Sequence, residues 1–233
     1  MRNAQKDARE MAKKRESMLK SGFELFSARA IEPVTMKEIA DASGIGIATV
    51  YRYFPSKLDL VIAIAVRKWG EFLNYVKEND GRLNISDMTA AEQFAHYLDY
   101  YVLLYRQYRA ILRFNYDFNL FVINAGATAE QLAEYTNTIN EFARMFAAVY
   151  EKGRLDGTLR TDLPAEALFT ASAHIMLAVA TRYAAGLVYH AQSDANDSEE
   201  LEMLRDMLTD RFTVKGQSII NGQAAENPAG DRK

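Results

Sequence analysis

The segment from Thr35 to Phe54 carries side chains whose types and spacing suit contact with a nucleic acid. Its pattern is that of two short helices separated by Gly44, a residue type that ends helices in the left-handed conformation. A second helix with small side chains at its N-terminal end fits the major groove of DNA. The residues expected to anchor both helices to a core are Ile39, Ala40, Ile45 and Val50.

The outward side chains of this segment are suited to two kinds of contact. Thr49 can hydrogen-bond to a base edge, and alanine or isoleucine can contact thymine methyl groups. Tyr51, Tyr53 and Lys57 carry hydroxyl or ammonium groups that suit phosphates, and such contacts fix the register. The expected outward face of the second helix consists of Ile47, Ala48, Thr49, Tyr51 and Arg52.

Helical periodicity runs through almost the whole chain, and the few glycines and prolines fall between the periodic stretches. The pattern predicts roughly nine helices, which include a first helix at about 4–28, a connecting helix at 57–77 and a last helix at about 199–220. Loops are expected at 79–81, 153–157 and 194–198, and the tail at 221–233 is expected to be disordered. Hydroxyl residues with a capping partner three positions later are Thr35/Glu38, Ser56/Asp59, Thr89/Glu92 and Thr128/Gln131.

The net charge of −3 is unevenly distributed. Residues 1–70 contain 13 Lys and Arg against 8 Asp and Glu, so that this part carries +5 and the rest −8. Such asymmetry favours a nucleic-acid-binding end, although chance variation in solvated faces gives the same pattern. The chain contains no cysteine, which excludes disulfides and thiolate metal sites. No signal peptide or membrane span is recognisable, so a cytoplasmic location is expected.

Over about residues 15–65 the sequence closely resembles the TetR family of bacterial transcriptional regulators. The matching residues are Thr35, Ile39-Ala40, Ala42, Gly44-Ile45, Thr49-Val50-Tyr51, Tyr53-Phe54, Ser56-Lys57 and Leu60. The resemblance implies an all-α fold, with a three-helix DNA-binding domain at 1–56 joined by a long helix to a larger ligand-binding and dimerisation domain at 57–220. It also implies base-side contacts from Ile47, Ala48, Thr49 and Arg52, and phosphate contacts from Thr35, Tyr51, Tyr53 and Lys57.

Three positions depart from the family's usual pattern. Gly46 stands where the family has a serine or threonine cap, so one hydroxyl for a phosphate is missing. Ala30 stands where a glycine commonly ends the first helix. Tyr53 replaces a frequent histidine and still offers a donor. The basic residues Lys6, Arg9, Lys13, Lys14 and Arg15 before the motif could contact the DNA backbone or minor groove, or form a solvated helix face together with Glu10 and Glu16.

Aromatic residues are concentrated between Phe94 and Phe121, where tyrosine dominates. Rings with polar tips suit a pocket for a flat or amphipathic molecule, and the resemblance implies an effector site in this part of the chain. Ordinary core packing is the alternative for any one of the rings. The candidate ligand-binding residues are Tyr97, Tyr100, Tyr101, Tyr105, Phe114, Tyr116, Phe118 and His174. Further polar candidates are Asp99, Arg113, Asp117 and Arg182.

The helix expected at 164–190 is apolar nearly all round and must be covered on most sides. With a stripe on the last helix it is expected to form a four-helix interface in a homodimer, as the resemblance implies. Packing within one subunit is the alternative. The stripe consists of Leu201, Leu204, Leu208 and Phe212.

Together these features predict a homodimeric repressor that binds a pseudo-palindromic operator and releases it when a small amphipathic or aromatic effector binds. An activator or a ligand-blind regulator of the same fold is an alternative. An all-helical enzyme is a more distant one, because no dinucleotide fingerprint, P-loop, zinc-protease motif or nucleophile elbow occurs. We therefore expect no catalytic residue, no cofactor and no metal site.

Overall fold

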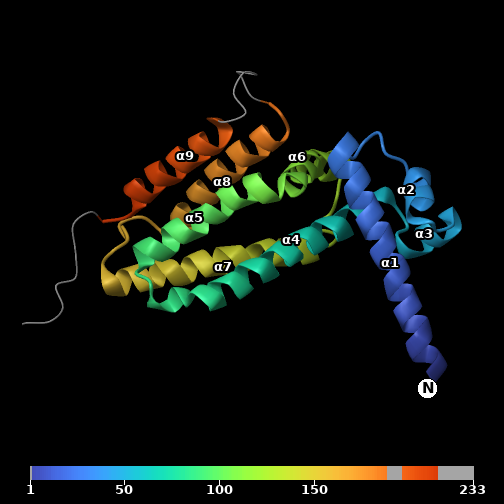
Figure 1. The fold of residues 1–233 in the computed structure, drawn as a ribbon, viewed down its shortest axis with the longest axis horizontal. Helices are drawn as coiled ribbons and strands as arrows, with labels where there is room; N and C mark the ends of the chain where they lie inside the picture. Colours follow the sequence, from blue (N-terminus) through green and yellow to red (C-terminus); the bar gives the residue numbers. More distant parts are fainter. Residues whose placement is uncertain (1, 188–195, 215–233) are drawn as a thin grey trace, which may run out of the picture.

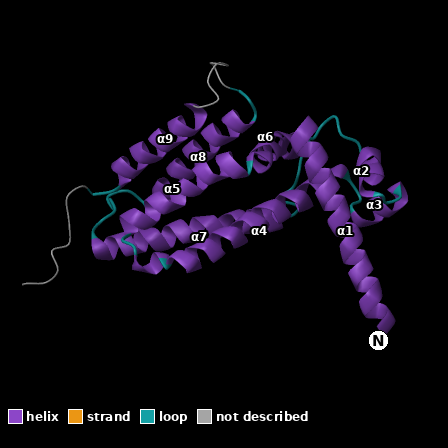
Figure 2. Ribbon diagram, viewed as in Figure 1, coloured by secondary structure: helices purple, strands orange, loops and turns teal. Residues whose placement is uncertain are grey.

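The computed structural model describes residues 2–187 and 196–214, and these are almost entirely helical (Figures 1 and 2). Within them lie nine α-helices, one 3₁₀ turn and no β-strand, as the all-α prediction requires. Their bounds are α1 (Arg2–Arg29), α2 (Met36–Ser43), α3 (Ile47–Tyr53), α4 (Lys57–Leu83), η1 (Ile85–Asp87), α5 (Ala90–Gln107), α6 (Arg109–Asn124), α7 (Ala133–Asp156), α8 (Ala165–Ala184) and α9 (Asn196–Phe212).

The helices form a small head and an elongated body (Figure 1). α1, α2 and α3 make up the head, and α4 runs from the head along α7. α5 contacts α8 and α9 in the other layer of the body, and α6 contacts both α1 and α8. The N-terminal half of α1 projects past the head, and its residues 6–16 are exposed.

Buried apolar side chains form two clusters, one in the head and one in the body. The head cluster joins residues of α1–α3 and the start of α4 with Phe114, Phe118 and Val122 of α6. Leu19 and Phe26 of α1 are buried in it, with Phe23 packed against it. The larger body cluster lies between α4, α5, α7, α8 and α9. Because the head cluster extends past residue 56, the predicted domain boundary there is not a break in packing.

Helix α4 is longer than the sequence predicted. The expected loop at Asn79-Asp80-Gly81 is wrong, because these residues are helical and α4 ends only at Leu83. Asn79 donates a hydrogen bond to the Tyr100 hydroxyl, which in turn donates to the carboxylate of buried Asp80. These contacts with α5 hold the polar segment in the helix.

Three further boundaries differ from the prediction. Gly153 lies inside α7, packed against Leu159, and the helix ends at Asp156 with Gly157 as its C-cap. α8 ends at Ala184 and not at His190, since residues 185–187 form a turn, and His190 lies outside the described residues. α9 ends at Phe212 and not at Ile220, because Thr213 forms an isolated bridge with Leu159. The predicted tail at 221–233 also lies outside the described part.

The predicted capping pairs form as expected at three helix starts. Thr35, Ser56 and Thr89 each begin a helix with a complete capping box. Thr128 and Gln131 exchange the same pair of hydrogen bonds, but α7 begins only at Ala133.

Candidate nucleic-acid interface and ligand cavity

The capping box of Thr35 fixes the start of α2. The Thr35 hydroxyl accepts a bond from the Glu38 amide at 3.2 Å and donates to the Glu38 carboxylate at 2.9 Å. The backbone amide of Thr35 and the Arg29 guanidinium also donate to this carboxylate, and together they lower the pKa of Glu38 to about 2. The hydroxyl that was predicted to meet a phosphate therefore already has a partner, and a phosphate contact from it requires that the donor bond be exchanged.

The turn between α2 and α3 follows the predicted geometry. Gly44 ends α2 in the left-handed conformation, at φ 68°, and its amide bonds back to carbonyls of α2. Ile39, Ala40 and Val50 are buried, and Ile45 packs against the head cluster. Gly46 is the N-cap of α3 and makes no side-chain cap. These contacts orient α3 from its buried side and leave its other side open.

The open side of α3 consists of the residues that the sequence predicted. Ile47 is 39% exposed and Tyr51 is 47% exposed, and Ala48 and Arg52 are also exposed. Thr49 is half-buried. The face offers methyl groups, a hydroxyl and a guanidinium, which are the groups that contact base edges.

Basic and hydroxyl side chains flank this face. Tyr53 is half-buried, with the Arg52 guanidinium 5.9 Å from the centre of its ring. The Lys57 ammonium donates to the Glu32 carbonyl oxygen and lies beside Phe121 of α6. Burial lowers the pKa of Lys57, while the Glu32 and Glu38 carboxylates oppose that shift. Lys57 thus belongs both to the head surface and to its junction with the body.

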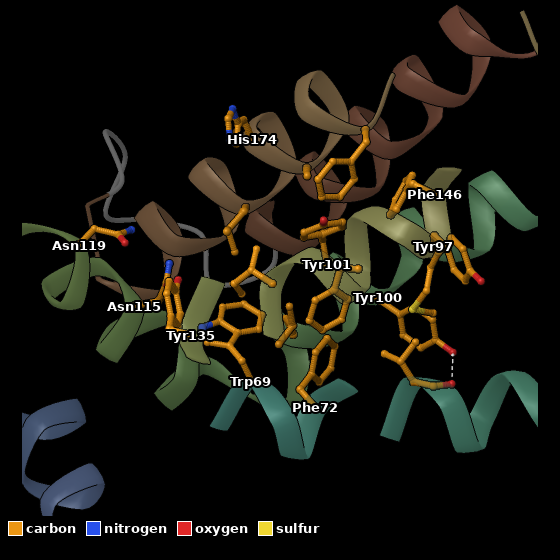
Figure 3. Close-up of a pocket in the computed structure, with 18 residues that line it drawn as sticks. Trp69, Phe72, Tyr97, Tyr100, Tyr101, Asn115, Asn119, Tyr135, Phe146 and His174 are labelled. Atoms are coloured by element: carbon orange, nitrogen blue, oxygen red, sulfur yellow. Dashed lines mark hydrogen bonds between the residues drawn. The ribbon is translucent and has the colours of Figure 1, made fainter. Parts of the chain in front are cut away.

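The second candidate site is a cavity of about 300 Å³ inside the body. It lies between α4, α5, α6, α7 and α8 and is lined mainly by aromatic and aliphatic side chains. Figure 3 shows the rings of Trp69, Phe72 and Tyr101 in the middle of the lining, with Asn115 near Tyr135 on one side and Tyr97 near Phe146 on the other. Its size and lining are those of a small-molecule site.

Half of the predicted ligand-binding residues line this cavity. They are Tyr97, Tyr100, Tyr101 and His174. Burial raises the pKa of the Tyr101 hydroxyl and raises that of Tyr135 to about 12. Both phenols are therefore neutral at physiological pH.

The other four predicted residues lie elsewhere. Tyr105 packs against Tyr183 and beneath Arg109. Phe114 and Phe118 belong to the head cluster, and Tyr116 is 40% exposed. The further polar candidates Asp99, Arg113, Asp117 and Arg182 are not among the lining residues either, and Asp99 pairs with Arg205.

Several lining residues escaped the sequence analysis because they lie outside the aromatic-rich stretch. Trp69, Phe72 and Val76 repeat at helical spacing along α4, and Phe142 and Phe146 do so along α7. Their periodicity identifies a buried face. The sequence could have shown that α4, α5 and α7 each have a buried face. Only the packing of the three helices shows that these faces border one cavity.

A buried polar cluster lies behind one wall of the cavity. The Tyr100 hydroxyl donates to the Asp80 carboxylate at 2.6 Å, and Nε2 of His96 lies 2.9 Å from the same oxygen. Burial, followed by the hydrogen bond and the charge of Asp80, raises the pKa of Tyr100. The cluster thus holds the Tyr100 ring in place with a carboxylate behind it.

Comparison with known proteins gives a family for the head. Residues 18–64 match the family described as "Bacterial regulatory proteins, tetR family". The HTH-type transcriptional repressor KstR of Rhodococcus jostii is 31% identical over 98 residues, which cover 39% of this chain and 43% of that protein. The chain thus aligns with less than half of the length of the curated relatives that it matches.

Solved structures resemble the chain over a larger part of its length. A transcriptional regulator from Saccharomonospora viridis, in complex with choline, superposes with a TM-score of 0.66 at 18% identity, over 86% of this chain and 98% of that one. The regulator FadR from Bacillus subtilis, in complex with stearoyl-CoA, gives a TM-score of 0.57 at 16% identity, over 83% and 97%. These likenesses establish a common fold.

No helix in the part of the chain that the structure describes is long and apolar enough to span a membrane. The head of this chain, over residues 18–64, matches the tetR family of bacterial regulatory proteins, and head and body together share the fold of the solved regulators.

Proposed function

We propose that this protein is a homodimeric transcriptional repressor that binds a pseudo-palindromic operator and releases it when a small molecule enters the cavity of the body. The exposed face of α3 is the proposed base-reading surface, with Ile47, Ala48, Thr49 and Arg52 toward the bases. The proposed phosphate contacts are Tyr51, Tyr53 and Lys57. Thr35 can make a further phosphate contact only if its hydroxyl stops donating to the Glu38 carboxylate.

The main observation in support of a ligand response is that α6 borders both the cavity and the head cluster. Asn115 and Asn119 of this helix line the cavity, while Phe114, Phe118 and Val122 belong to the head cluster. A molecule that displaces one face of α6 therefore acts on the side chains that support α1 and α4. Operator affinity falls only if the ligand prefers a body conformation in which the two heads are wrongly spaced.

The proposed dimer uses the outer faces of α8 and α9. The predicted stripe of Leu201, Leu204, Leu208 and Phe212 does not serve, because it packs inside the subunit. On the outer side, Ile175 is 41%, Met203 59% and Met207 62% exposed. A dimer through this face would carry two heads, and such pairs commonly read half-sites about 34–36 Å apart.

The relatives support a small-molecule effector without fixing its chemistry. Choline is bound by the Saccharomonospora viridis regulator and stearoyl-CoA by FadR of Bacillus subtilis, and the two ligands differ in both size and charge. The effector of this chain must therefore be inferred from its own cavity.

Footprinting of the purified dimer on the DNA upstream of its own gene tests the proposal. We expect protection of a pseudo-palindromic site at moderate salt, and loss of protection when the molecule identified by mass spectrometry of the natively purified protein is added in excess. An intact dimer without a specific site would overturn the operator-binding proposal. Ligand-enhanced protection would instead indicate an activator or corepressor mode.

A further inference from the structure

We propose that the cavity is selective for a lipophilic organic cation, such as an ammonium with an apolar body, over carboxylates, sulfonates or phosphates. The inference rests on the proposed function for the existence of an effector site. The class of molecule follows from the side chains that line the cavity.

Several aromatic rings pack together in the wall of the cavity, mostly edge to face. The ring centroids of Trp69, Phe72 and Phe142 lie 6.1–6.3 Å from one another, and Tyr100 lies 6.2 Å from Phe72. In Figure 3 the Tyr101 ring faces the same space. The negative face of such rings attracts a cation within about 6 Å, most strongly for tryptophan and in a desolvated site.

The described residues that line the cavity include no Lys, Arg, Asp or Glu, and the histidine among them, His174, is exposed. An anion in the buried part of the cavity would leave water without meeting a lysine or arginine, and burial of an unpaired anion is costly. A quaternary or alkylated ammonium is weakly hydrated and can replace water by ring faces. The lining therefore discriminates most strongly against anionic head groups.

A carboxylate behind the wall adds to this preference. Asp80 is 8% exposed and lies one helical turn after the lining residue Val76. Among the ion pairs of the described residues, only His96 pairs with it, and no lysine or arginine does. Its bond from the Tyr100 hydroxyl, 2.6 Å long, draws electron density toward the phenol ring that borders the cavity. Negative charge is thus held one ring away from the ligand.

Asn115 supplies a polar group in the lining of the cavity. Its side chain borders the cavity, the residue is 3% exposed, and none of the hydrogen bonds between described residues involves its amide. Buried polar groups in native proteins are normally paired. A hydroxyl or carbonyl on the body of the ligand would satisfy this amide, which Figure 3 shows near Tyr135 and away from Tyr97.

Three soluble probes with the same shape test the charge preference. They are para-hydroxyphenyltrimethylammonium, para-tert-butylphenol and para-hydroxybenzenesulfonate, which differ only in a positive, neutral or negative end group. Titration calorimetry of the full chain, without DNA, measures each affinity, and the fluorescence of Trp69, the single tryptophan, reports binding in the cavity. We expect the ammonium to bind at least about tenfold more tightly than the sulfonate.

A charge-removing variant tests the part assigned to Asp80. Asp80→Asn should weaken binding of the ammonium probe roughly three- to tenfold and leave the neutral phenol within about twofold. Glu78→Gln is the matched control, since Glu78 lies on the same helix with its side chain 69% exposed. It should alter neither affinity.

Each outcome separates the ligand class from the proposed function. A sulfonate that binds as tightly as the ammonium, or no binding of any probe, overturns the inference even when the protein protects its operator. Equal weakening of ammonium and phenol in Asp80→Asn would reduce Asp80 to a structural role and would refute the electrostatic argument. Conversely, failure to find an operator would sink the proposed function and leave the order of the three probes unaffected.

Discussion

Lys57 and Glu32 join the start of α4 to the loop between α1 and α2, through a hydrogen bond of 2.8 Å from the ammonium to the backbone carbonyl oxygen. The same nitrogen lies 5.4 Å from the centre of the Phe121 ring of α6. An ammonium has three donors, so a phosphate can be bound while the bond to Glu32 persists. Lys57 is therefore suited to couple DNA contact with the junction between head and body.

Lys57→Met tests this phosphate contact, because methionine preserves an apolar stem beside Phe121 and removes the charge. Loss of one phosphate contact per subunit should reduce the slope of log affinity against log salt by about 0.9 for each subunit. Fluorescence anisotropy of labelled operator at several salt concentrations measures the slope.

Lys68→Met is the control for the same change of net charge. The Lys68 ammonium lies 4.6 Å from the centre of the Phe23 ring and pairs with Glu71. We expect its slope to equal that of the wild type. If both variants flatten the slope equally, the effect belongs to overall charge and not to a contact of Lys57.

Ala30 adopts φ 66°, in the left-handed region that glycine occupies without steric cost. Ala30→Gly should therefore stabilise the fold by about 1 kcal/mol, which corresponds to a rise of roughly 3 °C in Tm. The glycine also gives the unfolded chain more freedom, so the gain is smaller than the full relief of strain.

The control for this stabilisation is Ala148→Gly, at an exposed position in the interior of α7. A glycine there should lower stability by about 1 kcal/mol. Thermal unfolding followed by circular dichroism distinguishes the two. A lower Tm for both variants would refute the strain at position 30.

The head was predictable from sequence because its signals are local. The capping pairs, the glycine after α2 and the burial of Ile39 and Val50 depend on neighbours within a few positions. The same local rules failed at residues 79–81, since Asn79 and Asp80 are held in a helix by Tyr100, a residue 20 positions away from Asp80. Contacts between helices override a turn-forming composition.

The cavity was predictable only in part, for a related reason. Periodicity marks the buried face of a helix, but it does not distinguish a solid core from a cavity wall. On α6, Phe114 and Phe118 enter the head cluster while their neighbours Asn115 and Asn119 line the cavity. On this helix the prediction selected the aromatic residues, whereas the residues that border the cavity are the two asparagines.

Gly46 is the N-cap of α3 and has room for a side chain. Its φ of −59° suits any residue, and a Cβ there would meet nothing within 4 Å. Gly46→Ser should cap α3, add a few tenths of a kcal/mol of stability and tighten operator binding about threefold through an added phosphate contact. Gly46→Ala, which lacks the hydroxyl, should not bind more tightly than the wild type in the same anisotropy assay.

Thr49 and Tyr51 are proposed to make different kinds of contact, and a panel of operators changed one base pair at a time separates them. Thr49→Ala should alter the preference at one or two base positions by about fivefold. Tyr51→Phe should weaken binding to every operator by about tenfold, because a phosphate bond carries no sequence information. A uniform loss for Thr49→Ala would contradict its base-side role.

Met207, 62% exposed on α9, belongs to the proposed dimer face, together with Met203. In a two-fold interface the same patch meets itself, so Met207→Glu brings two carboxylates close together and should raise the dimer dissociation constant at least about tenfold. Leu83→Glu adds the same charge at an exposed apolar residue at the end of α4. Sedimentation equilibrium should find Met207→Glu largely monomeric at micromolar concentrations at which the wild type and Leu83→Glu are dimers. A dimeric Met207→Glu would exclude this face, and operator binding would then require another interface.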